Sequence, residues 1–279
     1  MKLRSLLFVP GDRPDRMEKA REAGADALIL DLEDSVTPAR KAMARAAVSA
    51  FLSDRRGLRV FVRINPVDSD IFADDLAAIL PHMPDGVVLP KAEGAKHLDC
   101  LKDAGVAMPI LPIATETPRA IFKLGDYADG DWPLAGLTWG AEDLPAAIGA
   151  TTARNGDGQF TAPYEMIRSL TLFAAHAAGA PAIETVFPDV GDLDGLHAYA
   201  ARGYRDGFSG MMAIHPAQVA IINTAFSPTS AQIAHARAVV GAFETNSESG
   251  ALMLDGRMID APHLKAAKRL LAQADRAER

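Results

Sequence analysis

Cysteine, net positive charge and long apolar runs are all scarce in this sequence. The one cysteine, Cys100, excludes an intrachain disulfide. The net charge of −7 argues against a nucleic-acid binder, because such proteins rely on a broad basic face. The apolar run within Met1 to Pro10 is too short for a signal peptide or a membrane span. We therefore expect a cytoplasmic protein that binds neither nucleic acid nor membranes.

The sequence shows no internal repeat and no low-complexity segment, and its composition is that of a globular protein. Of the 279 residues, 49% are hydrophobic and 23% are charged, which supports a sizeable core and argues against disorder. A single α/β barrel takes about 250 residues. The length therefore fits one barrel with an appendage.

Eight short apolar runs, each bounded by Gly or Pro, recur along most of the chain. They read as nearly continuous hydrophobic segments, as expected of strands that are covered on both faces. Their spacing leaves room for a helix between successive strands, which predicts a parallel sheet. The runs therefore predict an α/β fold of the (β/α)8 TIM-barrel type. The predicted strands are Ser5 to Gly11, Ala27 to Asp34, Arg59 to Pro66, Gly86 to Glu93, Pro109 to Glu116, Ala135 to Asp143, Ile183 to Asp189 and Gly210 to Gln218.

Two segments interrupt the regular alternation. The stretch from Gly149 to Ala162 follows the sixth strand, and we expect it to cover the catalytic face of the barrel. The closed barrel needs no chain beyond residue 224, so we divide the protein into a catalytic barrel domain, 1–224, and a C-terminal helical extension, 225–279. The extension is predicted to contain a helix from about Ser230 to Glu244 and a last helix after Asp260. We expect it to pack on a neighbouring subunit.

Acidic side chains stand at the carboxyl ends of adjacent predicted strands, where barrels carry their functional residues. Glu116 ends the fifth strand and Asp143 ends the sixth. Mg²⁺ prefers oxygen ligands and keeps several waters, so two protein carboxylates and substrate oxygens suffice. No cluster of His and Cys typical of zinc competes. We therefore predict that Glu116 and Asp143 hold Mg²⁺. The alternative is that they only pair with Lys91 or Arg63 in a buried salt network.

Arg63 is predicted to point into the mouth of the barrel, because it shares a strand face with Phe61 and Asn65. A guanidinium there can grip a carboxylate or stabilise an oxyanion. Equally, it can be a structural partner for the acids that end the second strand. Together with Lys91, we expect those acids to surround the metal waters and Arg63 rather than to bind the ion directly. The acids are Asp31, Glu33 and Asp34.

Substrate binding is also expected from the backbone after the sixth strand. The chain enters a helical turn at Gly140, Ala141 and Glu142, and the free N–H groups of such a turn favour a carboxylate. This arrangement suits a 2-oxo acid that chelates Mg²⁺, with Glu116 as a ligand of the same ion.

Several ordered motifs resemble those of the citrate lyase β-subunit-like and malyl-CoA lyase family, within the HpcH/HpaI aldolase superfamily. They span almost the whole chain at compatible spacings, which is much more specific than any single motif. The motifs are LLFVPG at 6–11, LDLEDSV at 30–36, VRIN at 62–65, LPKAE at 89–93, WGAEDL at 139–144 and IHP at 214–216.

The resemblance implies a modified (β/α)8 barrel, an Mg²⁺ cofactor and a homo-oligomer, either a trimer or a hexamer. It also implies that a carbon–carbon bond is made or broken between a 2-oxo acid and the enolate of an acyl-CoA thioester. By position, Glu116 and Asp143 correspond to the metal ligands of the family. Arg63 corresponds to an arginine that binds the substrate and stabilises the enolate.

The resemblance assigns roles to residues near both ends of the chain. Phe8, Arg13 and Lys19 correspond to positions that hold coenzyme A, whose phosphates the two cations suit. Otherwise, Arg13 and Lys19 are solvated charges on the first helix. Asp260 corresponds to an aspartate that reaches the active site of the neighbouring subunit as acid or base. Its alternative role is an N-cap for the last helix, because Ala-Pro follows it.

The implied activity is Mg²⁺-dependent cleavage or formation of a 3-hydroxyacyl-CoA thioester such as malyl-CoA or citramalyl-CoA, with a 2-oxo acid and acetyl-CoA as the other reactants. Four alternatives stay open. The protein can be a citrate lyase β-subunit that acts on an acyl-carrier-protein thioester, or a thioesterase for malyl-CoA. It can be a metal-independent aldolase that forms a Schiff base through Lys91. Last, it can be a barrel that binds a ligand or scaffolds a complex without turnover.

Overall fold

The chain forms two compact units in the computed structural model, which describes residues 2–156, 158–246 and 250–277. The first unit comprises Leu3–Asn223 and the second Thr224–Arg279. Within the described ranges, no helix is both long and apolar enough to cross a membrane.

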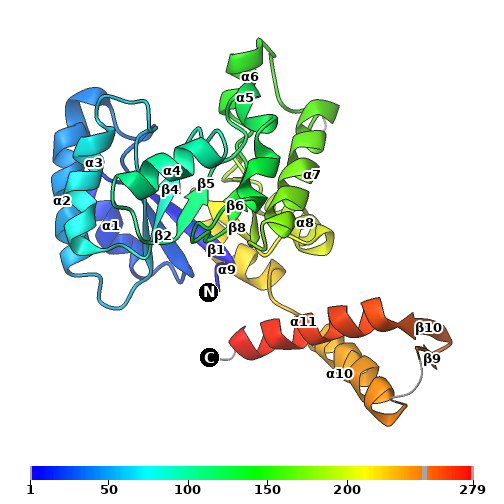
Figure 1. Cartoon of the computed structure of the whole chain (residues 1–279). Coiled ribbons are helices and arrows are strands. Elements are labelled where there is room, and N and C mark those ends of the chain that lie inside the picture. Colours follow the sequence, from blue (N-terminus) through cyan, green and yellow to red (C-terminus); the bar gives the residue numbers. More distant parts are fainter. Residues whose placement is uncertain (1, 157, 247–249, 278–279) are drawn as a thin grey trace. The chain divides into compact units, whose positions relative to one another are not determined.

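Eight parallel strands form the sheet of the first unit, in the order β5-β4-β3-β2-β1-β8-β7-β6. The two ends of this sheet meet, because the N–H of Ala114 donates to the Thr138 carbonyl over 2.9 Å and that of Ala135 to the Ile110 carbonyl over 2.8 Å. The sheet is therefore a barrel, and the predicted (β/α)8 TIM-type fold is confirmed (Figure 1). The strands are β1 (Ser5–Pro10), β2 (Ala27–Asp31), β3 (Val60–Arg63), β4 (Gly86–Leu89), β5 (Ile110–Pro112), β6 (Leu137–Thr138), β7 (Ala182–Glu184) and β8 (Gly210–Ala213).

Alternate side chains of the strands fill the barrel interior. Ile29 and Phe61 lie on neighbouring strands, are fully buried and belong to one apolar cluster. Gly86 leaves room for the Phe61 ring, because a Cβ at this position would lie 2.2 Å from a ring carbon. Side chains alternate along a strand, so the residues two places after Ile29 and Phe61 point to the same side, at the carboxyl ends of the strands. These residues are Asp31 and Arg63.

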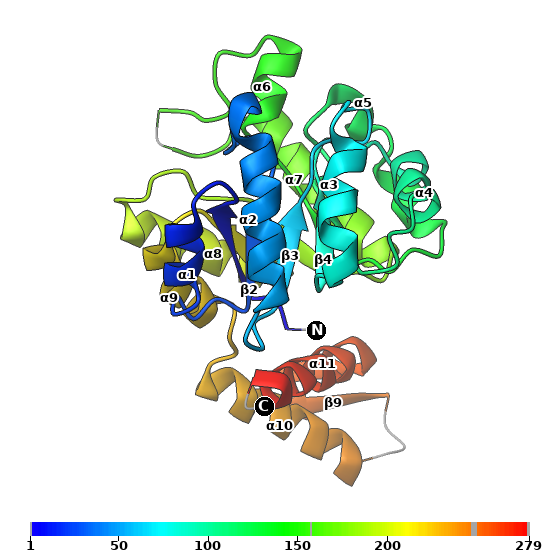
Figure 2. The ribbon, with the colours of Figure 1, turned by 90° about the vertical axis from the view of Figure 1, so that its left-hand side faces the viewer.

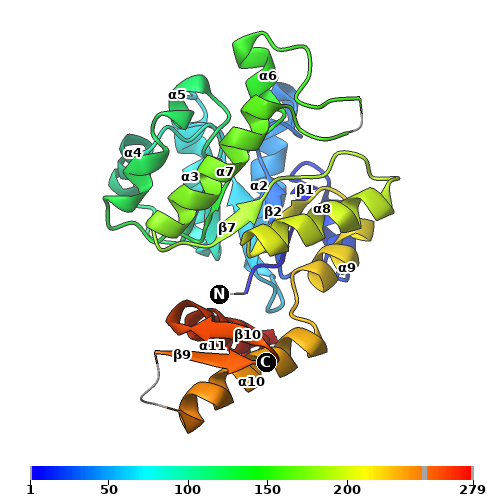
Figure 3. The ribbon, with the colours of Figure 1, turned by 90° about the vertical axis from the view of Figure 1, so that its right-hand side faces the viewer.

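Helices cover the outside of the barrel. In α2, Ala44, Val48, Phe51 and Leu52 recur at helical spacing and are all buried, so one face of the helix packs inward. Figure 2 shows α2 beside α3, and Figure 3 shows α7 and α8 on another side of the barrel. The helices of this part of the chain are α1 (Pro14–Ala20), η1 (Pro38–Arg40), α2 (Lys41–Ser53), α3 (Phe72–Ile79), η2 (Leu80–His82), α4 (Ala95–Asp103), α5 (Pro118–Ile121), η3 (Leu124–Ala128), α6 (Asp143–Ile148), α7 (Ala162–Ala177), α8 (Leu193–Asp206) and α9 (Pro216–Ala225).

The second unit is a helix pair with a β-hairpin. Its helices α10 (Ser230–Thr245) and α11 (Ala261–Ala277) pack together, and β9 (Ala251–Leu254) pairs with β10 (Arg257–Asp260) in an antiparallel ladder. At the hairpin turn, Asp255 and Gly256 both have positive φ, 49° and 75°, which is the backbone that a two-residue hairpin turn favours. The helices confirm the predicted C-terminal helical extension. The hairpin is an additional element beyond the predicted helices.

Candidate active site

Arg63 is held at the mouth of the barrel by two acids at the carboxyl end of β2, Asp31 within the strand and Glu33 after it. Its Nε and Nη2 donate to the two carboxylate oxygens of Asp31 over 2.6 and 2.7 Å, and its Nη1 lies 3.0 Å from Glu33 Oε2. The guanidinium carbon lies 4.9 Å from the centre of the Phe8 ring, a cation–π contact. The structural pairing that the sequence left open is therefore present. A guanidinium has five N–H donors, so these contacts leave some of them for a ligand.

The pairing keeps both Arg63 and Asp31 ionised. Burial alone would raise the pKa of Asp31, but the hydrogen bonds and charge of Arg63 outweigh this and hold it below its ordinary value. Burial likewise lowers the pKa of Arg63, and the contacts with Asp31 and Glu33 more than offset this, so that pKa is raised. Arg63 therefore presents a permanent positive charge in a fixed orientation.

Lys91 connects the acids after β2 to the acid after β5. Its ammonium forms an ion pair with Glu33 and lies 3.8 Å from Asp34, which is exposed. Its backbone N–H donates to Glu116 Oε2 over 2.6 Å, and Lys91 has a left-handed φ of 49° there. Although burial lowers the pKa of Lys91, the contact with Glu33 raises it overall. A protonated amine is a poor nucleophile, which argues against a Schiff base at this lysine.

A second lysine fixes the loop that carries these acids. Lys41, the first residue of α2, donates from Nζ to the carbonyls of Leu32 and Glu33 over 2.6 and 2.8 Å and to Asn65 Oδ1 over 2.8 Å. Asn65 in turn donates to the fully buried Asp75. Lys41 begins a helix instead of ending a strand and no motif marks it, so the sequence alone does not predict this role. Its contacts fix the main chain at Glu33.

Glu116 lies against the chain that follows β6. A Cβ at Gly140 would be 2.6 Å from Glu116 Cγ, so only glycine allows this approach without a shift. Thr115 Oγ1 accepts the Gly140 N–H over 3.1 Å and links the two strand ends. Gly140 therefore allows Glu116 to lie close to the backbone. Its N–H donates to Thr115, so it is not available to a substrate carboxylate. The role of the Ala141 and Glu142 backbone N–H groups as donors to a carboxylate stays a prediction.

Glu116 and Asp143 form the candidate cation site. Glu116 is buried, whereas Asp143, the first residue of α6, is half-buried. The pKa of Glu116 is raised to about 8, first by burial and then by the negative charges of Asp143 and Glu33. A divalent cation would neutralise such a buried carboxyl beside a second carboxylate, so the residues fit Mg²⁺. In the described chain, no cluster of three or more His, Cys, Asp or Glu is arranged to hold a metal. Glu116 and Asp143 would hold the ion together with water and substrate oxygens.

The three residues predicted to hold coenzyme A lie on β1 and around α1. Phe8 contacts Arg63 at the mouth. Arg13 directly precedes α1 and pairs with Asp15 over 3.2 Å, and Lys19 is exposed in the last turn of α1. Both cations are thus accessible to an anionic ligand, and their contact with coenzyme A stays a prediction.

Asp260 is the last residue of β10 in the second unit. Its carboxylate contacts the ring of His263, with 2.5 Å between Asp260 Oδ1 and His263 Nδ1. Among the residues that the structure describes, no backbone N–H of α11 donates to this carboxylate, so the N-cap alternative is not what the structure shows. The reach of Asp260 into a neighbouring active site stays a prediction.

A second cluster of buried charge lies between β7, α7 and α8. Arg168 donates from Nε to Glu184 over 2.7 Å and from Nη1 to Asp206 over 2.7 Å. Glu184 also accepts from Trp139 Nε1 over 2.6 Å and from the Tyr199 hydroxyl over 2.8 Å. No sequence pattern marks this cluster, because its five members come from four separate segments of the chain.

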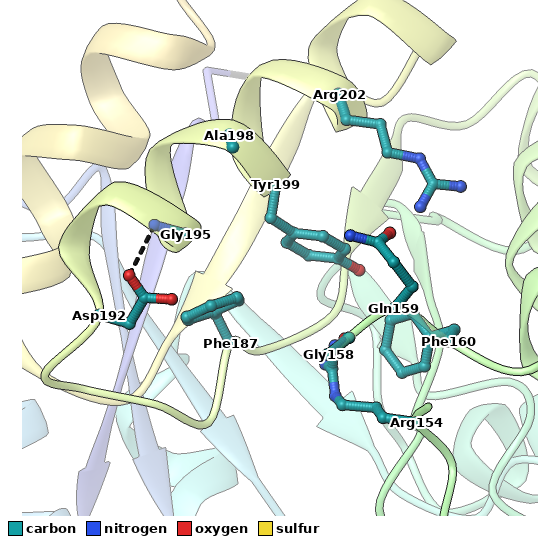
Figure 4. A pocket seen from close by; sticks show the side chains of 10 residues that line it. All are labelled: Arg154, Gly158, Gln159, Phe160, Phe187, Asp192, Gly195, Ala198, Tyr199 and Arg202. Carbon is teal, nitrogen blue, oxygen red and sulfur yellow. Dashed lines mark hydrogen bonds between the residues drawn. The ribbon is translucent and has the colours of Figure 1, made fainter. Parts of the chain in front are cut away.

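A cavity of about 200 Å³ lies next to this second cluster, between α8 and the segment that precedes α7. Figure 4 shows the rings of Phe187 and Tyr199 on one side of it and Arg154 beside Phe160 on the other. Arg154 stacks on Phe160, with 3.8 Å between the guanidinium carbon and the ring centre. The acids of the barrel mouth do not line this cavity, so it is separate from the candidate cation site.

Together, the barrel and its mouth define a class of protein. The strand ends carry a fixed arginine, a lysine and a buried carboxyl beside a second carboxylate, as expected of a barrel enzyme that binds a small oxygen-rich acid with a divalent cation. The family model described as HpcH/HpaI aldolase/citrate lyase matches residues 4–216. The chain belongs to this family, which confirms the resemblance seen in the motifs.

Relatives of the chain match it over nearly its whole length. A citrate lyase subunit beta-like protein of Mycobacterium tuberculosis is 37% identical over 271 residues, which cover 97% of this chain and 95% of the relative. A (3S)-malyl-CoA thioesterase of Cereibacter sphaeroides is 32% identical over 278 residues, which cover 98% and 94%. The crystal structure of CitE from Mycobacterium tuberculosis in complex with magnesium, acetoacetate and coenzyme A matches with a TM-score of 0.86 and 35% identity over 98% of each chain.

Proposed function

We propose that the protein is an Mg²⁺-dependent carbon–carbon lyase that cleaves or forms a 3-hydroxyacyl-CoA thioester such as malyl-CoA or citramalyl-CoA. Cleavage yields a 2-oxo acid and acetyl-CoA. One observation carries the proposal. The buried Glu116 carboxyl, whose pKa is raised to about 8 in part by the charge of Asp143, lies at the same barrel mouth as Arg63. Membership of the family, the malyl-CoA thioesterase relative and the related structure with magnesium, acetoacetate and coenzyme A support it.

The mouth residues divide the work of the reaction. Glu116 and Asp143 would hold Mg²⁺, which when bound acts as a Lewis acid toward the oxygens of the oxo acid. Arg63, fixed by Asp31, stabilises the negative charge of the thioester enolate. Lys91 keeps Glu33 in place through its ion pair. The backbone N–H groups of Ala141 and Glu142 orient the carboxylate of the acid.

In the cleavage direction, the bond between the thioester Cα and the hydroxyl-bearing carbon breaks, and the hydroxyl proton passes to water. The electron pair of that bond becomes the enolate, whose carbon then takes up a proton from Asp260 of a neighbouring copy. Phe8, Arg13 and Lys19 hold the coenzyme A portion. We further expect a cytoplasmic homo-oligomer, a trimer or a hexamer, because one copy supplies Asp260 to the next.

Hydrolysis of malyl-CoA is the second candidate function, favoured by the 32% identity to a malyl-CoA thioesterase. A citrate lyase β-subunit that acts on an acyl-carrier-protein thioester is favoured by the citrate lyase subunit beta-like relative. A Schiff-base aldolase is disfavoured, because Glu33 keeps the Lys91 amine protonated.

An assay with product identification tests the proposal. Purified full-length protein is incubated with malyl-CoA, citramalyl-CoA and citryl thioesters, with Mg²⁺ or with EDTA. We expect Mg²⁺-dependent release of acetyl-CoA and an oxo acid from a free CoA thioester. Free coenzyme A and a hydroxy acid as products would establish the thioesterase instead. Activity that resists EDTA, together with borohydride trapping, would overturn the metal mechanism in favour of Lys91.

A further inference from the structure

Asp260 and His263 form a carboxylate–imidazole pair at the junction of β10 and α11. His263 Nδ1 lies 2.5 Å from Asp260 Oδ1, and the two side chains are 55% and 38% exposed. His263 belongs to the first turn of α11, and residues three apart at such a turn face each other. The contact is local to one chain segment, so the hairpin and the helix together fix its geometry.

We assign a proton to His263 Nδ1 from the geometry of this contact. An ionised carboxylate only accepts hydrogen bonds, so the imidazole nitrogen at 2.5 Å is the donor. The Asp260 N–H also approaches Nδ1, over 3.3 Å, but a ring nitrogen that donates its proton has no lone pair for a second donor. Oδ1 of Asp260 is therefore engaged by His263, and Oδ2 is the oxygen that can exchange a proton with a substrate.

We propose that His263 is a positioning residue that holds the Asp260 carboxylate in the orientation for proton transfer. This inference rests on the proposed lyase function, in which Asp260 protonates the enolate carbon. The Nδ1–H bond prevents the carboxylate from turning to cap α11, which is the ordinary role of an aspartate before a helix. It also stabilises the ionised carboxylate that remains after the proton has left.

The proton transfer is balanced as follows. In cleavage, the proton on Asp260 Oδ2 moves to the enolate carbon, whose electron pair forms the new C–H bond of acetyl-CoA. In synthesis, a methyl proton of acetyl-CoA moves to Oδ2 and leaves the enolate. His263 keeps its own proton on Nδ1 in both directions, so it acts only through Asp260.

Two variants of full-length protein test the inference, His263→Ala and His263→Asn. Each is assayed with Mg²⁺, acetyl-CoA and the best of glyoxylate, pyruvate and oxaloacetate. His263→Ala should lower kcat roughly tenfold to a hundredfold, because the supporting hydrogen bond is lost. Its KM values should stay within about twofold of those of the wild type. His263→Asn should recover most of the rate, because its amide N–H replaces Nδ1–H. His235→Ala, an exposed histidine on α10, is the matched control and should not change kcat.

Deuterium uptake from solvent into the methyl group of acetyl-CoA provides a second readout, because it reports proton transfer without the carbon–carbon bond. It should fall by the same factor as kcat in His263→Ala, whereas a purely structural role would not separate Ala from Asn. Equal rates for His263→Ala and wild type would overturn the inference.

Asp260→Asn separates this inference from the proposed function. If Asp260→Asn keeps full activity, the assigned role of Asp260 fails, and the role of His263 fails with it. If Asp260→Asn is inactive while His263→Ala is fully active, only the positioning role is wrong. In the Asp260→Asn background, His263→Ala should cause no further loss, because the two residues act as a unit.

Discussion

Two buried arginines in the barrel have similar partners and different consequences. Each arginine has two close acidic partners, Asp31 and Glu33 for Arg63 and Glu184 and Asp206 for Arg168. Each also lies over a phenylalanine ring, at 4.9 and 4.7 Å. Around Arg168, both oxygens of Glu184 accept hydrogen bonds from other side chains. Around Arg63, the buried Glu33 Oε2 accepts no hydrogen bond from the described residues, although Arg63 Nη1 lies 3.0 Å away as an ion-pair partner.

Hydrogen bonding does not separate the two networks cleanly, because Arg168 Nη2 also lacks an acceptor in the described chain. The balance of positive and negative charge separates them more clearly. Two further arginines contact Asp206, so the acids around Arg168 are matched by cations. At the mouth, Arg63, Lys91 and Lys41 are three cations among five acids, and the mouth therefore carries an excess of acidic groups that a divalent cation would neutralise. The five acids are Asp31, Glu33, Asp34, Glu116 and Asp143. A balanced network supports the fold, whereas an unbalanced one marks a binding site.

Exchanging one buried glutamate of each network for glutamine gives the largest expected contrast. Glu116→Gln should lower kcat/KM on the order of a thousandfold, because loss of a metal ligand removes several kcal/mol of transition-state stabilisation. Metal-free Glu116 is mostly protonated at pH 7, since its pKa is raised to about 8, so glutamine should leave the free energy of unfolding nearly unchanged. Glu184→Gln should lower that free energy by about 3 kcal/mol, because it breaks a buried ion pair. Equal stability losses in urea denaturation would contradict this contrast.

Replacing each arginine by lysine sharpens the contrast, since lysine cannot form two parallel hydrogen bonds. Arg63→Lys should lower kcat/KM by about a hundredfold, because the oxyanion loses a donor. Arg168→Lys should instead lower the free energy of unfolding by about 2 kcal/mol, since one acid loses its partner. Steady-state kinetics and urea denaturation measure both effects. An Arg63→Lys variant with full activity would reduce Arg63 to a structural partner.

A methyl group at Gly140 gives the smallest expected effect. Its carbon would lie 2.6 Å from Glu116 Cγ, so the carboxyl must move. We expect Gly140→Ala to weaken Mg²⁺ binding about tenfold, as other changes beside metal ligands do. Gly125→Ala is the matched control, because no atom lies within 4 Å of the position that its Cβ would take. Calorimetric titration with Mg²⁺ measures both, and equal affinities would show that Glu116 does not bind the ion.

The strands were predictable because burial on both faces leaves a continuous apolar run. The predicted runs overlap all eight strands, but several continue into the loops that follow. The run from Ala135 to Asp143 contains a strand of only Leu137–Thr138, and β7 begins one residue before the run that predicts it. Apolar residues in these loops are buried under the helices, so hydrophobicity alone does not mark where the ladder ends.

The candidate site was predictable only in its residue types. Strand ends and family motifs identify Glu116, Asp143 and Arg63, but the division of Asp31 and Glu33 between Arg63 and Lys91 depends on side-chain geometry. The hairpin before Asp260 has a sequence signal, the Asp-Gly pair between two apolar runs. The packing of the C-terminal extension on a neighbouring subunit stays a prediction.

The most direct test of whether Glu116 and Asp143 share one divalent cation is the affinity of the full-length protein for Mn²⁺. Electron paramagnetic resonance measures this affinity at several pH values. A proton on Glu116 competes with the ion, so the affinity should rise about tenfold per pH unit below a pH of about 8 and level off above it. Glu116→Gln and Asp143→Asn should each lose the site, while Glu184→Gln keeps it. Unchanged Mn²⁺ affinity in either of the first two variants would contradict the shared site.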